Sequence, residues 1–388
     1  MISERAKNIT PSTTLAITSR AKKMKKEGKD VVILAAGEPD FPTPDRIKEF
    51  AIKAINNNFT NYTATAGIPE LKDAICKKFF RDNGLTYTPS RVMVNCGGKH
   101  ALYNCFQSLL NPGDEVILSV PYWNSYIEQV KLAGGKTIEI PSKPDMSLNM
   151  EGIKHSITEK TKVILINSPS NPSGYVISRE EAESLGEILI KNKHIFLISD
   201  EVYEYFIYDG KHYTIAAMFP ELKERTVIIN AVSKTYSMTG WRIGYAAGPE
   251  EIIASMTKLQ DHMTSNPSSI SQMAALEAIN GSQEDVKIMV EEFRKRREFL
   301  IDNLNKLPLI KCSPPKGAFY AFVDISNTGI ASGEFANRLL DEQLVAVIPG
   351  NAFGIDNYIR LSFAASRESL EKGIERIEKF LRKVNGEK

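Results

Sequence analysis

The sequence predicts an α/β protein in which a mostly parallel sheet is covered by helices, with a smaller α+β domain built from the N- and C-termini. Between residues 91 and 248, short β-branched runs alternate with segments of helical period, as in sheets whose parallel strands are joined by helices. After about Gly281 the pattern changes to a long charged helix followed by isolated strands among helices. A chain of 388 residues is long enough for one large core and a second, smaller one.

Seven apolar runs are predicted to form the large sheet. A helix is expected over His100–Leu110, because its apolar residues recur at helical spacing and form one stripe. Another is expected to begin at Ser178, because Glu181 stands three residues later in a capping-box arrangement. The predicted strands are Val92–Cys96, Glu115–Val120, Lys136–Ile140, Val163–Ile166, His194–Ser199, Val227–Asn230 and Ile243–Ala247.

The two ends of the chain are predicted to form the small domain, over residues 1–45 and 285–388, with the large domain over residues 46–284. The first 45 residues contain one strand run, Val31–Ala36, which is expected to join the C-terminal unit. Three further strands are predicted there, Ala318–Val323, Val345–Ile348 and Tyr358–Phe363. The basic run Arg294–Arg297 is interpreted as a solvated helix face, because glutamates flank it on both sides.

Composition excludes several classes of protein. Lys and Arg number 49 against 47 Asp and Glu, so the net charge of +2 provides no field that favours nucleic acid or an anionic membrane. No apolar run approaches the roughly 20 residues that cross a bilayer. Residues 1–10 lack the apolar core of a signal peptide, so a cytoplasmic protein is expected. The four cysteines lack CxxC spacing and the five histidines lack metal-binding spacing, which predicts reduced thiols and no metal site.

Polar motifs follow four of the predicted strands, at the edge where open α/β sheets bind ligands. Gly97–Lys99 opens a helix and either approaches an anion or forms a plain turn. Asn171, in the sequence NSPSNPSG, either donates to a bound oxygen or belongs to a tight turn. Asp200 is either a helix cap or the partner of a cation, and Lys234 is either solvated or a Schiff-base amine. Neither GxGxxG nor GxxxxGK[ST] occurs, so a nicotinamide dehydrogenase loses its main support.

Read in order along the chain, these and other segments form a specific set, although each one is short. They are Pro11–Thr14, Gly37–Phe41, Ala66–Leu71, Gly97–Lys99, Asn171–Pro172, Ser199–Glu201, Ser233–Lys234, Gly240–Arg242 and Tyr358–Ser362. The set resembles that of the fold-type I, pyridoxal-phosphate-dependent aminotransferases, and within them the prokaryotic-type aspartate aminotransferases. The resemblance covers nearly the whole chain.

The resemblance implies that pyridoxal 5′-phosphate is the cofactor and assigns residues to it. Lys234 would form the Schiff base and act as general acid and base, and Asp200 would keep the pyridine nitrogen protonated. Tyr203 and Asn171 would hydrogen-bond the phenolic oxygen. The remaining expected contacts are the phosphate ligands Gly98, Lys99, Ser233, Arg242 and, from the neighbouring subunit, Tyr62, together with Trp123 stacked on the ring. Ala231 departs from relatives that carry a phosphate-binding serine three residues before the lysine.

The resemblance also implies how an amino acid and a 2-oxo acid would bind. Arg360 would clamp the α-carboxylate, because its guanidinium suits a bidentate contact. Segment 265–271 offers no cation for a distal carboxylate, so Lys99 is expected to meet it instead. These expectations predict transamination between aspartate or glutamate and 2-oxoglutarate or oxaloacetate by a ping-pong mechanism. The expected substrate contacts are Gly37, Trp123, Asn171, Arg360, Lys99, Ser12 and Thr14.

Other readings stay open at this stage. Within the same fold, the substrate could be an aromatic amino acid, alanine or prephenate, or the reaction a β-elimination or decarboxylation. A catalytically silent regulator that binds pyridoxal phosphate would carry a DNA-binding module, which is not expected here because the transferase-like Pro11–Ser12 stands so close to the first residue. A homodimer with shared active sites is expected, since Tyr62 and part of Thr264–Ser271 would reach the partner's site.

Overall fold

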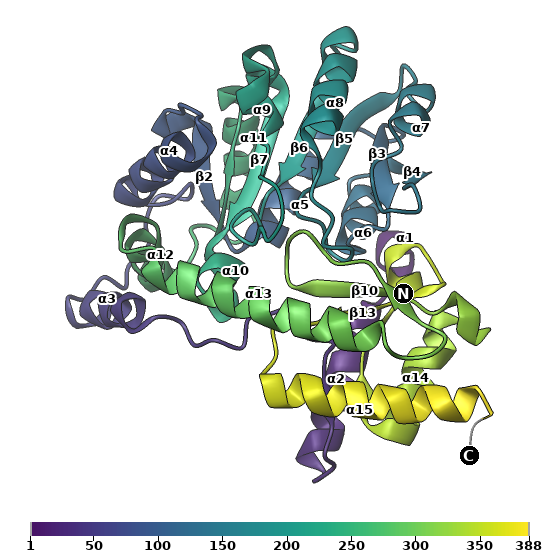
Figure 1. Ribbon diagram of the computed structural model, residues 1–388. Coiled ribbons are helices and arrows are strands. Elements are labelled where there is room, and N and C mark those ends of the chain that lie inside the picture. Colours follow the sequence, from purple (N-terminus) through teal and green to yellow (C-terminus); the bar gives the residue numbers. More distant parts are fainter. Residues whose placement is uncertain (1, 387–388) are drawn as a thin grey trace.

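A seven-stranded sheet lies at the centre of the larger part of the molecule in the computed structural model, which describes residues 2–386 (Figure 1). The strand order is β2-β8-β7-β6-β5-β3-β4, and every neighbouring pair is parallel except the two that involve β8. The predicted mostly parallel sheet is therefore confirmed. Its strands are β2 (Val92–Asn95), β3 (Glu115–Val120), β4 (Lys136–Pro141), β5 (Thr161–Asn167), β6 (Phe196–Asp200), β7 (Thr226–Ala231) and β8 (Gly244–Ala247).

Helices cover both faces of this sheet, which explains why its inner strands, such as β5, read as continuous apolar runs. Along β5, Val163 packs into the core on one face and Ile164 into the core on the other, because successive side chains of a strand point in opposite directions. The predicted capping box begins α8, where Ser178 Oγ accepts from Glu181 N at 3.2 Å. The helices of this part are α4 (Pro69–Asn83), α5 (Gly98–Leu109), α6 (Ser125–Leu132), α7 (Met150–His155), α8 (Arg179–Lys191), α9 (Ile215–Met218), α10 (Val232–Thr235), α11 (Glu250–Asp261) and α12 (Ser269–Asn280).

The chain ends form a second unit around a four-stranded sheet of order β12-β13-β10-β9 and a two-stranded sheet, β1-β11. Strand β1 pairs in parallel with β11, with Val32 opposite Val345, so the first 45 residues do join the C-terminal segment as expected. The strands are β1 (Val32–Ile33), β9 (Lys311–Cys312), β10 (Tyr320–Asp324), β11 (Val345–Ala346), β12 (Ile348–Pro349) and β13 (Tyr358–Ser362). The other helices are α1 (Glu4–Lys7), α2 (Thr13–Lys26), α3 (Asp45–Asn56), α13 (Glu284–Leu304), α14 (Ser332–Gln343) and α15 (Arg367–Val384), and short 3-10 turns occupy Pro89–Arg91, Pro220–Arg225, Thr239–Trp241, Ser326–Thr328 and Gly350–Phe353.

The prediction of one continuous strand over Val345–Ile348 is wrong. The run Val345–Ile348 is divided at Val347 into β11, which pairs with β1, and β12, which pairs with β13. The chain passes from one sheet to another within this run, and all of it is buried. An apolar run of four residues is equally compatible with either arrangement, so its composition could not reveal the change of partner.

The interpretation of Arg294–Arg297 as a solvated helix face is also wrong. Helix α13 lies between the large sheet and α15 (Figure 1), and Arg296 and Arg297 are buried on it. Arg296 donates to both carboxylate oxygens of Asp40 at 2.8 Å, and Arg297 contacts the Pro315 carbonyl at 2.6 Å and forms an ion pair with Asp209. These partners are distant in sequence, so the run fastens the helix to both parts of the molecule.

No helix among residues 2–386 is both long enough and apolar enough to cross a membrane.

Candidate active site

A cavity of about 460 Å³ opens at the carboxyl ends of β5, β6 and β7, between the start of α5 and the unit built from the chain ends. Parallel strands bring their carboxyl ends to one edge, so motifs separated by tens of residues meet there. Twelve of the fourteen predicted site residues line this cavity. They are Thr14, Gly37, Gly98, Lys99, Trp123, Asn171, Asp200, Tyr203, Ser233, Lys234, Arg242 and Arg360.

Lys234 carries the amine of the site. It lies on α10, directly after β7, and its ammonium donates a hydrogen bond to the Gly37 carbonyl on the opposite wall. Desolvation within the cavity lowers the pKa of Lys234 to about 8, against the opposing effect of Glu38. The positive charges of Arg360, Arg242 and Lys99 lower it further. A lysine in this state is deprotonated in an appreciable fraction of molecules near neutral pH, so it can act as a nucleophile or a base.

Asp200 is the buried carboxylate of the site, at the end of β6. Desolvation raises its pKa to about 6, although three neighbours favour its charged form. The Tyr126 hydroxyl donates to Oδ2 at 2.7 Å and the Val202 amide donates to Oδ1 at 3.3 Å, while the third neighbour, Lys234, acts through its charge. A carboxylate held in this way is a prepared partner for a cationic group in the cavity.

Tyr203 follows Asp200 by three residues and is buried beside the cavity. Its hydroxyl shares a hydrogen bond of 2.8 Å with the Tyr320 hydroxyl from β10. Burial holds the pKa of Tyr203 well above its usual value, so the phenol stays protonated and can still donate to a ligand oxygen.

The start of α5 forms an anion cradle. The backbone amides of Gly98 and Lys99 stand in the first helical turn, where no intrahelical carbonyl can accept them. A Cβ on Gly97, which has φ +91°, would lie 2.4 Å from Arg242 Nη2, and a Cβ on Gly244 would lie 2.2 Å from the Gly98 amide nitrogen. Both glycines therefore permit a close approach that brings these amides and the Arg242 guanidinium to one wall of the cavity.

Arg360 is the buried guanidinium of the site, on β13. Its Nη1 donates to Asn171 Oδ1 at 2.8 Å and its Nη2 to the Ala35 carbonyl at 3.0 Å. Its Nε is buried and has no hydrogen-bond partner within residues 2–386. Neutral acceptors do not balance a buried cation, and a free N–H is costly, so this residue is suited to a carboxylate ligand.

Lys99 is the second cation near the substrate space. Its ammonium lies 4.9 Å from the centroid of the Trp123 ring, and burial lowers its pKa, as does the charge of Arg242. Thr14 lines the same cavity from α2. Lys99 therefore combines a backbone amide in the anion cradle with a side chain directed toward Trp123.

Two predicted residues do not line the cavity. Ser12 caps α2, where its hydroxyl accepts from the Leu15 amide at 3.4 Å. Tyr62 is 92% exposed on the surface of the single chain. The expected role of Tyr62 in the partner's site concerns a contact between two subunits and stays a prediction.

Sequence reasoning missed several residues of the cavity, including Tyr126, Tyr320, Glu38 and Asn167. Tyr126 stands one helical turn after Trp123, and this spacing is the only local signal that could have identified it. Tyr320 comes from another sheet, and the sequence near it carries no comparable motif.

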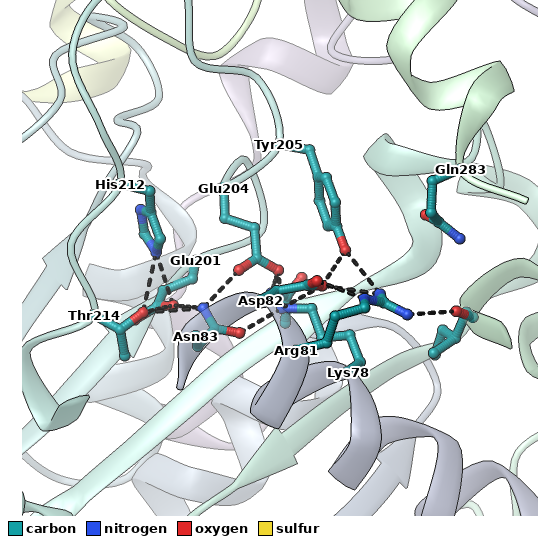
Figure 2. Close-up of polar contacts among 12 residues, drawn as sticks. Lys78, Arg81, Asp82, Asn83, Glu201, Glu204, Tyr205, His212, Thr214 and Gln283 are labelled. Carbon is teal, nitrogen blue, oxygen red and sulfur yellow. Dashed lines mark hydrogen bonds and ion pairs between the residues drawn. The ribbon is translucent and has the colours of Figure 1, made fainter. Parts of the chain in front are cut away.

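A buried polar network lies around Glu201 and Glu204, which follow Asp200 in the chain (Figure 2). Glu204 forms an ion pair with Lys78 of α4 and accepts from Asn83 at 2.8 Å and from Asn230 of β7 at 2.6 Å. Because Lys78 and Glu204 are both almost fully buried, each depends on the other for charge balance. The network thus connects α4 with the end of β7.

The other half of the network surrounds Glu201, the residue next to Asp200. Glu201 accepts from Ser199 at 2.8 Å and from Thr214 at 2.9 Å, and it lies 2.9 Å from His212 Nε2. Burial opposes a charge on His212, but the Glu201 carboxylate outweighs it and raises the pKa of His212. Ligand atoms of Glu201, Glu204 and His212 lie within 4.8 Å of one another, a proximity that histidine spacing in the sequence does not reveal. Lys78 already supplies a cation there, and the expectation that the protein has no metal site stays a prediction.

Together, the fold and the cavity define a class of protein: an α/β enzyme with a reactive amine, a buried carboxylate and an anion cradle at the carboxyl edge of its sheet. Comparison with known proteins identifies the family. Residues 29–377 match the model of the family "Aminotransferase class I and II", and the chain belongs to this family. It is therefore an aminotransferase with the fold-type I architecture.

Similar proteins match over the full length of the chain. The aspartate aminotransferase of Bacillus sp. (strain YM-2) is 50% identical, with 98% of this chain and 99% of that protein aligned. A probable aspartate/prephenate aminotransferase of Rickettsia conorii is 46% identical, with 98% of each chain aligned. The solved structure of the aspartate aminotransferase from Thermus thermophilus with maleate has a TM-score of 0.95 and 41% identity, covering 98% of this chain and all of that one.

Proposed function

We propose that this aminotransferase uses pyridoxal 5′-phosphate to exchange the amino group between aspartate or glutamate and a 2-oxo acid, by a ping-pong mechanism. The observation that carries the proposal is that the Lys234 amine, the Asp200 carboxylate and the Arg360 guanidinium face one cavity. Similarity to proteins named aspartate aminotransferase supports the choice of aspartate.

The cavity fits this cofactor by the chemistry of its donors. The Gly98 and Lys99 amides, Ser233 and Arg242 would hold the phosphate, in the cradle that a side chain on Gly97 would fill. Asp200 would pair with the ring nitrogen, and Asn171 and Tyr203 would meet the phenolic oxygen. Trp123 would cover one face of the ring, and Tyr62 of the partner subunit would complete the phosphate site.

When bound, the cofactor supplies an electron sink that acidifies the α-proton of an amino acid. Lys234 would provide the covalent attachment and would then carry the proton from the substrate Cα to the C4′ carbon of the cofactor, a role that suits a pKa near 8. Asp200 stays ionised to hold a positive charge opposite it, and Arg360 fixes the substrate through the α-carboxylate. The backbone of Gly37 lies next to this carboxylate site.

The distal carboxylate of aspartate would bind Lys99, with Thr14 of α2 and Ser12, the cap of that helix, as further contacts. A second candidate substrate is prephenate, which also carries a carboxylate away from the reacting centre. The similarity to proteins named aspartate/prephenate aminotransferase favours this alternative over an aromatic amino acid or alanine.

We further propose a cytoplasmic homodimer with shared active sites. Its support is the exposure of Tyr62 together with that of three large apolar side chains, Ile52 and Ile55 of α3 and Phe80 of α4. A reducing compartment is supported by the four cysteines, all of which are free. The boundaries at residues 45/46 and 284/285 are our proposal for the division into two domains.

The test is a visible absorption spectrum of the purified protein loaded with pyridoxal phosphate. Addition of aspartate should bleach the yellow form, and 2-oxoglutarate should restore it, because the two half-reactions are separable. Prephenate, phenylalanine and alanine are compared in the same assay. A spectrum that responds to none of these amino donors or acceptors would contradict the proposal.

A further inference from the structure

We infer that Tyr126 is a positioning residue for transamination: it orients the Asp200 carboxylate in its ionised form and at the same time sets the angle of Trp123. This inference rests on the proposed function. Tyr126 lies on α6, is only 2% exposed and borders the cavity without belonging to any of the motifs that pointed to the site.

The first contact is made by the hydroxyl group. It donates to Asp200 Oδ2 at 2.7 Å, while the Val202 amide occupies Oδ1 at 3.3 Å, so each carboxylate oxygen has a separate donor. Burial and the nearby Asp200 charge hold the pKa of Tyr126 well above its usual value, so the phenol keeps its proton. A donor that cannot ionise stabilises the charged carboxylate and restricts its rotation.

The second contact is made by the aromatic ring. Tyr126 meets Trp123 edge to face, with ring centroids 5.4 Å apart and planes at 89°. The Tyr126 amide also donates to the Trp123 carbonyl at 3.0 Å, so the two residues are fixed within one turn of the chain. The same side chain therefore contacts the expected partner of the ring nitrogen and the residue expected to cover the ring face.

Removing the Tyr126 hydroxyl should raise the proton affinity of the Asp200 carboxylate. Without this donor the Asp200 carboxylate binds a proton more tightly, so a proton shared with a ring nitrogen moves toward the carboxylate. The ring nitrogen then carries less positive charge, and abstraction of the α-proton slows. Substrate binding through Arg360 is unchanged, so the loss falls on kcat and spares KM.

The chain provides a matched control in Tyr122, four residues earlier. Its hydroxyl donates to Glu139 of β4 at 2.9 Å, whereas that of Tyr126 donates to Asp200. Tyr122→Phe and Tyr126→Phe each remove one hydrogen-bonded hydroxyl from the same segment. A general effect of losing a tyrosine hydrogen bond there would therefore appear in both variants.

The experiment measures the ring nitrogen directly, using pyridoxal phosphate labelled with ¹⁵N and bound to each holoenzyme. In Tyr126→Phe the ¹⁵N resonance should shift toward that of an unprotonated pyridine, and kcat for aspartate should fall about 10- to 100-fold, the range of a charged hydrogen bond. Tyr122→Phe should match the wild type in both measurements. An unchanged ¹⁵N resonance in Tyr126→Phe, or an equal shift in the two variants, would overturn the inference.

A double-mutant cycle with Asp200→Asn separates action through Asp200 from a general structural effect. Tyr126→Phe should have little further effect on kcat or on the dissociation constant of the cofactor once Asp200 is Asn. Additive losses would overturn the inference. If the wild-type protein takes up no pyridoxal phosphate, the proposed function itself fails. That result is distinct from an additive or a non-additive effect of Tyr126→Phe.

Discussion

At the scale of single residues, desolvation sets the charge of each reactive group in the cavity. It lowers the pKa of the Lys234 amine to about 8 and raises that of the Asp200 carboxyl to about 6, so the two values approach each other. Arg360 stays charged and keeps a buried Nε without a partner among the described residues. The cavity thus presents an amine that can lose its proton beside a cation that cannot, which suits a substrate with both an amino and a carboxylate group.

Lys234→Ala should abolish turnover and the covalent attachment of pyridoxal phosphate while the protein remains folded, because the Lys99 ammonium, also in the cavity, lies against the Trp123 ring instead. After borohydride reduction of the wild type, mass spectrometry should find the cofactor on the peptide that contains Lys234. Lys160→Ala, at an exposed loop position, serves as the control and should retain full activity. Label recovered on a different lysine would refute the assignment.

Lys99→Ala should lower kcat/KM for aspartate by about 1.5–3 kcal/mol, the scale of a charged hydrogen bond, and leave phenylalanine nearly unaffected. The physical reason is that only an acidic substrate places a carboxylate near this ammonium. Steady-state kinetics with both substrates provide the measurement. Equal losses for the two would instead place Lys99 in cofactor binding, and the preference for aspartate would lose its structural support.

At the scale of elements, buried polar groups join the strands that carry the reactive residues. Glu201 follows directly after β6, while Glu204 is hydrogen-bonded to Asn230 of β7 and paired with Lys78 of α4. The carboxyl ends of β6 and β7, which present Asp200 and Lys234, are therefore fastened to one helix as well as to each other. Removing one partner of such a network leaves a buried charge without compensation.

The pair Glu201–His212 should make stability depend on pH. The Glu201 carboxylate raises the folded-state pKa of His212 above the unfolded value near 6.5, so the charged pair contributes fully below that pH and its contribution is lost as pH rises through the folded pKa. Denaturant unfolding of wild type and His212→Gln, from pH 6 upward, should show a difference in the free energy of unfolding that shrinks with increasing pH.

The control for this prediction is His194→Gln, since His194 is exposed. Its effect on the free energy of unfolding should be small, because substitution of an exposed side chain removes few contacts. A difference between wild type and His212→Gln that stays constant from pH 6 to pH 9 would contradict a protonated His212 in the folded protein.

At the scale of the whole molecule, the cavity lies where the large sheet meets the unit formed by the chain ends. Arg360 and Tyr320 come from the four-stranded sheet, Asp200 comes from β6 of the large sheet, and Lys234 comes from α10, directly after β7. Helix α13 is held to both, through Arg296 to Asp40 and Arg297 to Asp209. The geometry between the amine and the guanidinium thus depends on contacts far from the cavity itself.

A homodimer with shared sites predicts complementation between two inactive variants. Tyr62→Ala and Lys234→Ala are mixed under conditions that exchange subunits, and each hybrid dimer should contain one site with both residues intact. Activity should therefore reappear in the mixture, and analytical ultracentrifugation should report a dimer. A fully active monomer, or a mixture that stays inactive despite exchange, would refute the shared site.

The sequence was enough to predict the strands of the large sheet and the places of the reactive residues along the chain. The strands of the large sheet were predictable because a strand buried on both faces must be apolar throughout, a local property. The positions of Lys234, Asp200 and Asn171 at strand ends followed from the same runs, and parallel topology then implied that they meet. The capping box at Ser178 was equally readable, since all its atoms belong to four consecutive residues.

The pairing of groups that are distant in sequence depended on the packing of the whole chain. Arg296 and Arg297 stand in a charged run that is typical of a solvated helix face. They are buried nevertheless, because they form ion pairs with Asp40 and Asp209 from other segments. Tyr126 is an ordinary core aromatic in the sequence, and its role emerges only when Asp200 is placed 2.7 Å from its hydroxyl. The physical reason is that burial and pairing depend on the whole packed molecule, whereas periodicity, capping and turn chemistry are determined within a few residues.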